Sequence, residues 1–229
     1  MPATRPYRMV ARAAAAEATR LRILDAARQL FAELLYDQVS LDAVAARAGV
    51  TVQTVIRRFT SKEHLFAAVA QWKSDQIRGA RDQALEGDLV GAIGNLFDTY
   101  EQWGDDVLNL LAQEQRTVLI RQVTDRGRRY HHAWVEQVFS PLLEDVPPEH
   151  RRRRLAQLIA ITDVYAWKIL RRDLGLHRQE AEATVRELAA GILRLAERSA
   201  SPGRPVVAAP LAGRMKRRNW PRADRGTAS

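Results

Sequence analysis

Apolar residues recur at intervals of three and four along most of this chain, which is the spacing of one face of an α-helix. From residue 18 the first run includes Ile23, Ala27, Leu30 and Leu34, and it predicts a helix that ends near Tyr36. Ala, Leu, Arg, Glu and Gln are abundant, and these residue types favour helices. We therefore expect an all-α protein with very little sheet.

Three further helices are predicted to start between residues 40 and 63. Ser40 stands before a short apolar run and can accept hydrogen bonds from the free N–H groups of the next turn. Gly49 follows that run, where a residue without Cβ adopts a positive φ at little cost. Thr51 is a second N-cap, and Thr60 with Glu63 has the spacing of a capping box, T-x-x-E. Helix starts at this density indicate a compact unit.

Two short helices joined at a tight turn with glycine form a helix-turn-helix, which presents its second helix outward. Val55 and Phe59, at i and i+4, form the buried edge of that second helix. A helix of this size fits the major groove of DNA, where Gln53 can pair with adenine, Val52 can touch a thymine methyl and Arg57 can reach guanine. The positions better suited to phosphates are Thr51, Thr54, Arg58 and Lys62. A small helical bundle with surface arginines would show a similar pattern.

Beyond residue 86 the helical pattern continues in longer segments. The expected helices span residues 88–103, 105–116, 118–139, 149–174 and 179–198. Ser140-Pro141 and a loop over residues 145–148 interrupt them. Gly175 is expected to take the left-handed conformation, with Leu176 packed back toward Leu170. The segment from residue 201 has no sustained periodicity, which is typical of a disordered tail.

The formal charge of +9 lies on the two ends of the chain. Residues 1–20 carry four arginines against one glutamate, and residues 201–229 carry seven basic residues against one aspartate, so the segment between them is neutral. Basic ends on a neutral body suit a polyanion such as nucleic acid, although solvated tails would have the same composition. No apolar run reaches the roughly 20 residues of a membrane-spanning helix, so no membrane partner is expected.

No motif indicates catalysis or the binding of a metal or cofactor. The chain has no cysteine, which excludes disulfides and thiolate sites. His131, His132 and Glu136 are close in sequence, but adjacent histidines on a helix point about 100° apart, and no third ligand is at suitable spacing. Glycine-rich phosphate loops and nucleophile elbows are also absent. We expect no enzyme, no metal and no cofactor.

The stretch from Val39 to Leu65, VSLDAVAARAGVTVQTVIRRFTSKEHL, resembles the DNA-binding domain of the TetR family of bacterial transcriptional regulators. The resemblance rests on A-x-x-A-G-V, a threonine N-cap, a phenylalanine that closes the second helix and the run Ser-Lys-Glu that opens the next. It implies DNA contacts from Thr51, Val52, Gln53, Thr54 and Arg57, and a phosphate contact from Lys62. Ile56 stands where the family most often has tyrosine and has no hydroxyl for a phosphate, a contact that Arg58 can supply instead.

The segment from Asp163 to Leu193 resembles the C-terminal domain of the same family, in which the last two long helices form a four-helix dimer interface. Helically spaced positions agree: Leu155, Ile159, Thr162, Ala166 and Ile169 in one helix, and Val185, Leu188, Ile192 and Leu195 in the other. Core packing within one chain would produce similar stripes. A two-fold dimer places its recognition helices in successive major grooves, about 34 Å apart, and reads a near-palindrome.

In the family, the helices between these two parts enclose a ligand pocket. Large aromatic side chains are common in such pockets. The candidates here are Phe97, Tyr100, Trp103, Tyr130, Trp134, Phe139 and Tyr165. Each of them would also serve as ordinary core, and the identity of the small-molecule effector does not follow from them.

The resemblance implies a homodimeric, cytoplasmic bacterial regulator that joins the nucleoid when bound to double-stranded DNA. Repression relieved by a small apolar or aromatic effector is the first expectation. We assign residues 1–17 to a basic arm, 18–66 to the helix-turn-helix domain, 67–200 to effector binding and dimerisation, and 201–229 to the tail. One alternative is a DNA-binding regulator controlled by a partner protein or by its own concentration. Another is a helical enzyme or adaptor whose helix-turn-helix binds no DNA.

Overall fold

The computed structural model describes residues 5–199 and the side chains of residues 12–194, and every regular element in that range is a helix. The all-α prediction is confirmed. The elements are α1 (Arg5–Glu33), η1 (Tyr36–Gln38), α2 (Leu41–Ala48), α3 (Val52–Phe59), α4 (Lys62–Arg81), α5 (Leu89–Ala112), α6 (Val118–Phe139), η2 (Ser140–Leu143), α7 (Pro148–Thr162), α8 (Val164–Lys168), η3 (Ile169–Asp173) and α9 (Arg178–Ser199). The predicted tail over residues 201–229 and the side chain of Leu195 lie outside the described residues.

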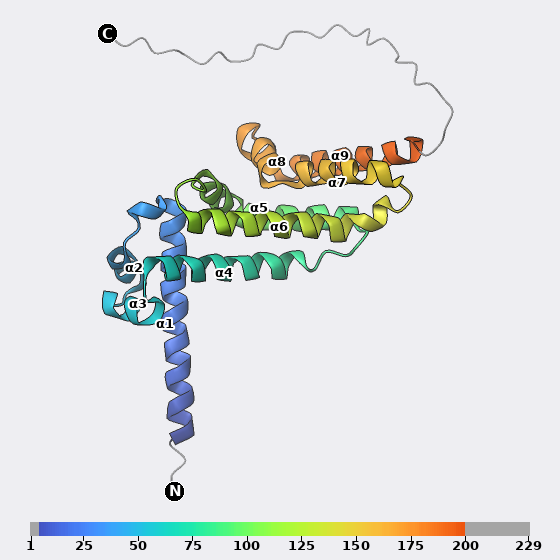
Figure 1. Ribbon diagram of the computed structural model, residues 1–229. Coiled ribbons are helices and arrows are strands. Elements are labelled where there is room, and N and C mark those ends of the chain that lie inside the picture. Colours follow the sequence, from blue (N-terminus) through green and yellow to red (C-terminus); the bar gives the residue numbers. More distant parts are fainter. Residues whose placement is uncertain (1–4, 200–229) are drawn as a thin grey trace, which may run out of the picture.

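The helices form two groups that share α4. α1 stands across one end of the long helices, with α2 and α3 beside it, and α5 and α6 run alongside α4 (Figure 1). α7, α8 and α9 lie on the other side of α5 and α6 (Figure 1). α4 contacts α1 and α3 as well as α5 and α6, so it links the two groups. Among the described helices, none is both long and apolar enough to cross a membrane.

Each group has its own apolar core, and a small aromatic cluster joins them. Ile23 and Val55 are fully buried in the core of α1–α4. Phe97 and Trp167 are fully buried in the core of α5–α9. Between the two cores, the Phe66 ring of α4 meets the ring of Tyr36 edge-on, with centroids 5.2 Å apart.

α1 begins much earlier than predicted. Its first residue is Arg5 rather than residue 18, so residues 5–17, which we interpreted as part of a basic arm, are helical. The run Ala13–Ala16 explains the extension, because alanine has the highest intrinsic helix propensity and the segment has no proline beyond Pro6. The helix ends at Glu33, and after Leu34 and Leu35 a single 3-10 turn covers Tyr36–Gln38.

The capping box predicted for α4 is wrong by one residue. Ser61 is the N-cap, and its Oγ accepts a hydrogen bond from the backbone N–H of His64 at 3.3 Å. Thr60 instead lies in the turn between α3 and α4 with a φ of 66°, a conformation that residues with Cβ rarely adopt. Thr60 and Glu63 therefore do not form the reciprocal pair that their spacing suggested.

Two predicted helix limits within the second group are also wrong. α5 is continuous from Leu89 to Ala112, with no break near residue 104. The predicted helix over residues 149–174 is interrupted at Asp163, whose φ and ψ are extended and whose carboxylate caps α8. Thr162 donates its hydroxyl back to the Leu158 carbonyl at 2.7 Å, and such bonds bend helices.

Two other predictions for the second group are confirmed. The bounds of α6 are as predicted. Gly175 has a φ of 67°, and the backbone N–H of Leu176 donates to the carbonyl of Leu170 at 3.0 Å.

Candidate DNA-binding surface and interior cavity

The turn between α2 and α3 is built by two side-chain caps and one glycine. Ser40 Oγ accepts from the N–H of Ala43 at 3.1 Å, and Thr51 Oγ1 accepts from the N–H of Thr54 at 3.2 Å. Gly49 ends α2 with a φ of 63°, where a Cβ would strain the backbone. These three predictions are confirmed, and they define the start of α3.

α3 buries one face and exposes the other. Val55 and Phe59 lie in the core formed with α1 and α2. The exposed residues of α3 and its cap are Thr51, Gln53, Ile56, Arg57 and Arg58, whereas Val52 and Thr54 are half-buried. The structure thus brings together all of the predicted DNA contacts except Lys62. Their contact with DNA stays a prediction.

Lys62 belongs to the next helix, where it is the first residue of α4. Its Nζ donates to the backbone carbonyl of Tyr36 at 3.2 Å and lies 4.5 Å from the centroid of the Tyr36 ring. The side chain is half-buried. Lys62 therefore holds η1 against α4, in addition to any contact with a phosphate.

α1 passes close to α3. The hydrogen-bonded guanidinium of Arg20 holds the pKa of Glu17 below its usual value, and the positive charge of Arg58 contributes to the same shift. Arg20 Nη2 lies 2.8 Å from Glu17 Oε1. Glu17 belongs to α1 and Arg58 belongs to α3. The effect of Arg58 on Glu17 therefore means that the two helices are close enough for their charges to interact.

A cavity of about 230 Å³ lies between α4, α5, α6 and the start of α8. Of the seven aromatic residues predicted for a pocket, Tyr100, Trp103 and Tyr130 line it. Phe97, Trp134 and Phe139 are buried core residues instead, because they fill the spaces between packed helices. Tyr165 is 51% exposed on α8 and does not line the cavity either.

The cavity also has a buried arginine that we did not predict. Arg81, the last residue of α4, is 4% exposed. Its guanidinium lies between two rings, 5.1 Å from the Tyr100 centroid and 5.4 Å from the Trp134 centroid. Ile77 also lines the cavity, one helical turn earlier, so Arg81 continues an apolar stripe at i+4. That spacing was a usable signal in the sequence.

His131 lies beside this arginine and is neutral. Its Nδ1 is 3.3 Å from Arg81 Nη1, and its Nε2 is 3.4 Å from Thr162 Oγ1. Burial, and then the charge of Arg81, lower the pKa of His131 to about 3. Because Arg81 can only donate, Nδ1 is the acceptor and the proton of the imidazole is on Nε2.

The end of α5 is hydrogen-bonded to the helix-turn-helix group. Gln113 Oε1 accepts from the backbone N–H of Tyr36 at 2.8 Å, and Asn109 Nδ2 donates to the backbone carbonyl of Ala32 at 2.9 Å. Leu110 and Leu111, from the same turns of α5, line the cavity. These hydrogen bonds tie the end of α5 to η1 and to the end of α1.

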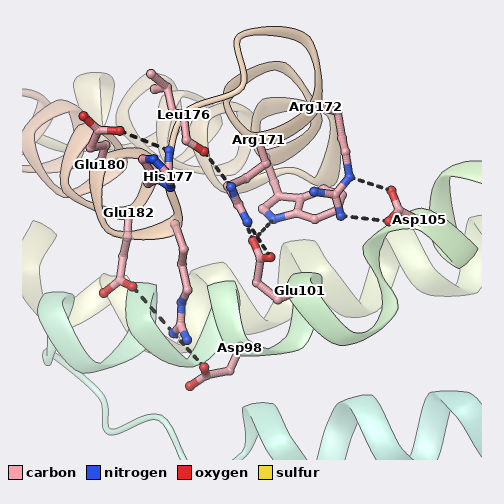
Figure 2. A network of polar contacts seen from close by, with 11 residues as sticks. Asp98, Glu101, Asp105, Arg171, Arg172, Leu176, His177, Glu180 and Glu182 are labelled. Atoms are coloured by element: carbon pink, nitrogen blue, oxygen red, sulfur yellow. Dashed lines mark hydrogen bonds and ion pairs between the residues drawn. The ribbon is translucent and has the colours of Figure 1, made fainter.

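An ionic network ties α8 and η3 to the other half of α5. Figure 2 shows Arg171 facing Glu101 and Arg172 facing Asp105. Arg171 Nε lies 2.6 Å from Glu101 Oε1, and Trp167 Nε1 donates to the same oxygen at 2.9 Å. The hydrogen-bonded Arg171 lowers the pKa of Glu101 to about 2. This network fixes the segment after the break at Asp163.

The residues predicted for a dimer interface differ in how far they are buried within the chain. Thr162 and Val185 are buried within the chain, where the alternative reading of these stripes as core packing places them. Leu188 is 50% exposed and Ile169 is 51% exposed. The other described members, which are half-buried, are Leu155, Ile159, Ala166 and Ile192.

Comparison with known sequences identifies the N-terminal unit. The model of a family described as "Bacterial regulatory proteins, tetR family" matches residues 23–69, which include α2, α3 and the first turns of α4. A longer match is with the HTH-type transcriptional activator FasR of Mycolicibacterium smegmatis. It is 30% identical over 173 residues, which cover 72% of this chain and 78% of that protein.

Solved structures share the fold. A tetR-family transcriptional regulator from Streptomyces coelicolor superposes with a TM-score of 0.61 at 23% identity, covering 80% of this chain and 83% of that one. A transcriptional regulator from Rhodococcus sp. Rha1 gives a TM-score of 0.61 at 17% identity, covering 77% and 96% of the two chains. At these identities the likeness concerns the fold alone.

Proposed function

We propose a function for this chain from the premise that it belongs to the TetR family of bacterial regulatory proteins and is therefore a DNA-binding transcriptional regulator. The observation that carries the proposal is the outer face of α3. It presents Gln53, Arg57 and Arg58 to solvent, while Val55 and Phe59 anchor the helix from behind. In our proposal α3 enters the major groove and reads base edges.

The proposed contacts divide by chemistry. Gln53 reads adenine, Val52 touches a thymine methyl and Arg57 reaches guanine or a phosphate. The side chains proposed for phosphates are Thr51, Thr54, Arg58 and Lys62. Of these side chains, Thr51, Gln53, Arg57 and Arg58 are exposed, and Val52, Thr54 and Lys62 are half-buried. Lys62 would have to leave the Tyr36 carbonyl, or share its three protons, to reach a phosphate.

We further propose a homodimer that binds a near-palindromic operator. The supporting observation is that α7 packs against α9 while Leu188 remains half exposed on α9. In our proposal a two-fold axis relates two copies of this pair, and the two copies of α3 then lie about 34 Å apart, which is one turn of DNA.

A small effector in the cavity would control that spacing. The cavity adjoins α4, which extends to the helix-turn-helix. It also adjoins α5, whose end is hydrogen-bonded to η1 and to the end of α1. An effector that binds better to the arrangement unable to bind DNA would release the operator. Each tenfold loss of affinity for the operator corresponds to about 1.4 kcal/mol of coupling between effector binding and DNA binding. A regulator controlled only by a partner protein would not need this cavity.

Repression is the first candidate for the direction of control, because a protein released by its effector most simply blocks a promoter. Activation is the second candidate, since the relative that is 30% identical is named a transcriptional activator. A reporter gene behind the selected operator, with and without the chain, distinguishes the two outcomes.

The proposal is tested by selecting bound fragments from random DNA. We expect an inverted repeat whose half-sites are about 10 base pairs apart or a multiple of that distance. Enriched fragments with a single half-site would contradict the dimer. No enrichment at low salt would contradict sequence-specific binding by α3.

A further inference from the structure

We propose that the cavity receives a carboxylic acid with an apolar body, and that Arg81 binds the carboxylate. This inference rests on the proposed function, because it names the chemical class of the effector. It starts from an unusual feature of the cavity: the guanidinium of Arg81 is buried there, and no described carboxylate is within ion-pair distance of it. Burying a charge is expensive unless it is paired.

Arg81 lacks the partner that a buried arginine normally has. Among the side chains that the structure describes, no carboxylate oxygen lies within 4.0 Å of its guanidinium, and its Nε makes no hydrogen bond. Its neighbour His131 is a neutral acceptor and cannot compensate the charge. The rings of Tyr100 and Trp134 hold the guanidinium in place, so it is preorganised for an anion.

The other cations of the cavity are already occupied or exposed. Lys73 Nζ lies 2.6 Å from Asp106 Oδ2, and Arg128 is paired with Asp125 at 2.8 Å. Arg126 is exposed to solvent. Among the described residues that line the cavity, Arg81 is therefore the buried cation that still has N–H groups available for an anion.

The rest of the lining selects the body and the charge of the ligand. Away from Arg81 the lining is mainly apolar, with Trp103, Val107 and Leu110 among its members. Asp163 also lines the cavity, so its negative charge would repel a dianion such as a phosphate monoester more strongly than a monoanion. A monoanion with an apolar body fits both features. The lining extends along α4 from Arg81 back to Ala67, which is about 21 Å at 1.5 Å per residue.

Binding at Arg81 would act on the helix that links the two groups. Arg81 is the final residue of α4, and its backbone carbonyl accepts from Trp134 Nε1 at 3.2 Å. The opposite end of α4 packs against α1 and α3. A carboxylate that draws the guanidinium toward the cavity would therefore shift one end of α4. The other end of α4 would pass that shift to the helix-turn-helix.

The experiment compares acids with their neutral amides. Straight-chain carboxylates of 6 to 16 carbons and phenylalkanoates are titrated against the purified full chain by calorimetry, each beside its primary amide. We expect at least one acid to bind roughly tenfold or more tightly than its amide. The same acid should weaken retardation of the selected operator, and methyl phosphate and octyl phosphate test the alternative anion.

Variants assign the preference to Arg81. Arg81→Met removes the buried charge while keeping an apolar chain of similar length, and it should reduce the acid-to-amide ratio to about one. Arg81→Lys should retain part of the ratio. Arg126→Met, at the exposed rim, is the matched control and should leave the ratio unchanged. Circular dichroism checks that each variant is folded.

Several outcomes would overturn the inference. These are equal binding of acid and amide by the unaltered chain, unchanged acid binding by folded Arg81→Met, tighter binding of the alkyl phosphate, or no binding of any acid. Each of these leaves operator binding by the ligand-free chain intact. Failure of the ligand-free chain to select DNA would instead contradict the proposed function, so the two failures are distinguishable.

Discussion

The indole of Trp167 lies directly on the backbone of Gly104. A Cβ added at Gly104 would stand 2.6 Å from Cζ3 of that ring, which is too close for any side chain. Trp167 is 1% exposed, and its Nε1 is held by Glu101 three residues earlier on α5. Glycine at this position is therefore a packing requirement between α5 and α8 rather than a helix breaker.

We expect Gly104→Ala to destabilise the protein by about 1 to 3 kcal/mol, because the ring or the helix must move to admit the methyl group. Urea denaturation measures the change. Gly79→Ala is the matched control: Gly79 is an exposed helical glycine with no atom within 4 Å of an added Cβ. That substitution should stabilise by about 0.5 to 1 kcal/mol. Equal effects of the two changes would contradict the packing argument.

The sequence predicts those helix ends that are determined locally. Ser40 and Thr51 each cap a helix through a hydrogen bond that spans three residues, and Gly49 supplies the turn from its own backbone. Such signals can be read from neighbouring residues alone. For the same reason α2, α3 and the outer face of α3 are found where they were expected.

The features that were missed depend on contacts between distant residues. The end of α7 is stabilised by the Tyr100 hydroxyl, which donates to the Thr162 carbonyl across a separation of 62 residues. The need for glycine at position 104 within α5 likewise depends on Trp167, which is 63 residues away in the sequence. Arg81 follows an apolar stripe, but a charged residue at that position equally indicates the end of a helix. The spacing alone therefore leaves both interpretations open, and the packing of α5 and α6 shows that Arg81 points inward.

Substitutions at Gln53 and Lys62 are expected to affect DNA binding differently. Gln53→Ala should weaken binding to the selected operator by about 1 to 3 kcal/mol and relax the preference at one base position. Lys62→Ala should weaken binding to all sequences and lower the salt slope by about one. Fluorescence titrations at several salt concentrations on specific and random duplexes measure both effects.

The contact of Lys62 with Tyr36 adds a second expectation. Because Nζ bonds the Tyr36 carbonyl and lies over its ring, Lys62→Ala should also lower the free energy of unfolding by about 1 kcal/mol. Gln53 is exposed, so Gln53→Ala should leave stability nearly unchanged. If the two variants had the same salt slope and the same base preference, the division into base and phosphate contacts would be wrong.

Stability should fall below neutral pH because His131 is buried in its neutral form. The pKa of His131 is lowered to about 3, from an ordinary value of 6.5, by burial and by Arg81. Below pH 6.5 the unfolded chain therefore binds a proton that the folded chain does not. The stabilising contribution is complete above pH 6.5 and is lost progressively as the pH falls toward 3.

Between pH 7 and pH 5 this group should reduce the free energy of unfolding by about 2 kcal/mol. His131→Gln should remove most of that dependence, and His64→Gln, at an exposed histidine of α4, controls for the loss of an imidazole. Urea denaturation at five pH values measures the slopes. A His131→Gln protein with the slope of the unaltered chain would contradict the neutral buried imidazole.

The proposed dimer is best tested at Leu188, which is half exposed on α9 although the neighbouring positions Val185 and Ala189 are buried. Leu188→Glu places a charge on the proposed interface without disturbing the core of the chain, so we expect a monomer by sedimentation velocity and an unchanged helical spectrum. Operator affinity should then fall by at least about 100-fold, because only one α3 remains available to each binding event. Leu85→Glu, at another exposed leucine outside α9, is the control and should remain dimeric. A dimeric Leu188→Glu protein with full affinity would mean that the two copies associate through a different face, and the spacing of the half-sites would then have to be explained from that face.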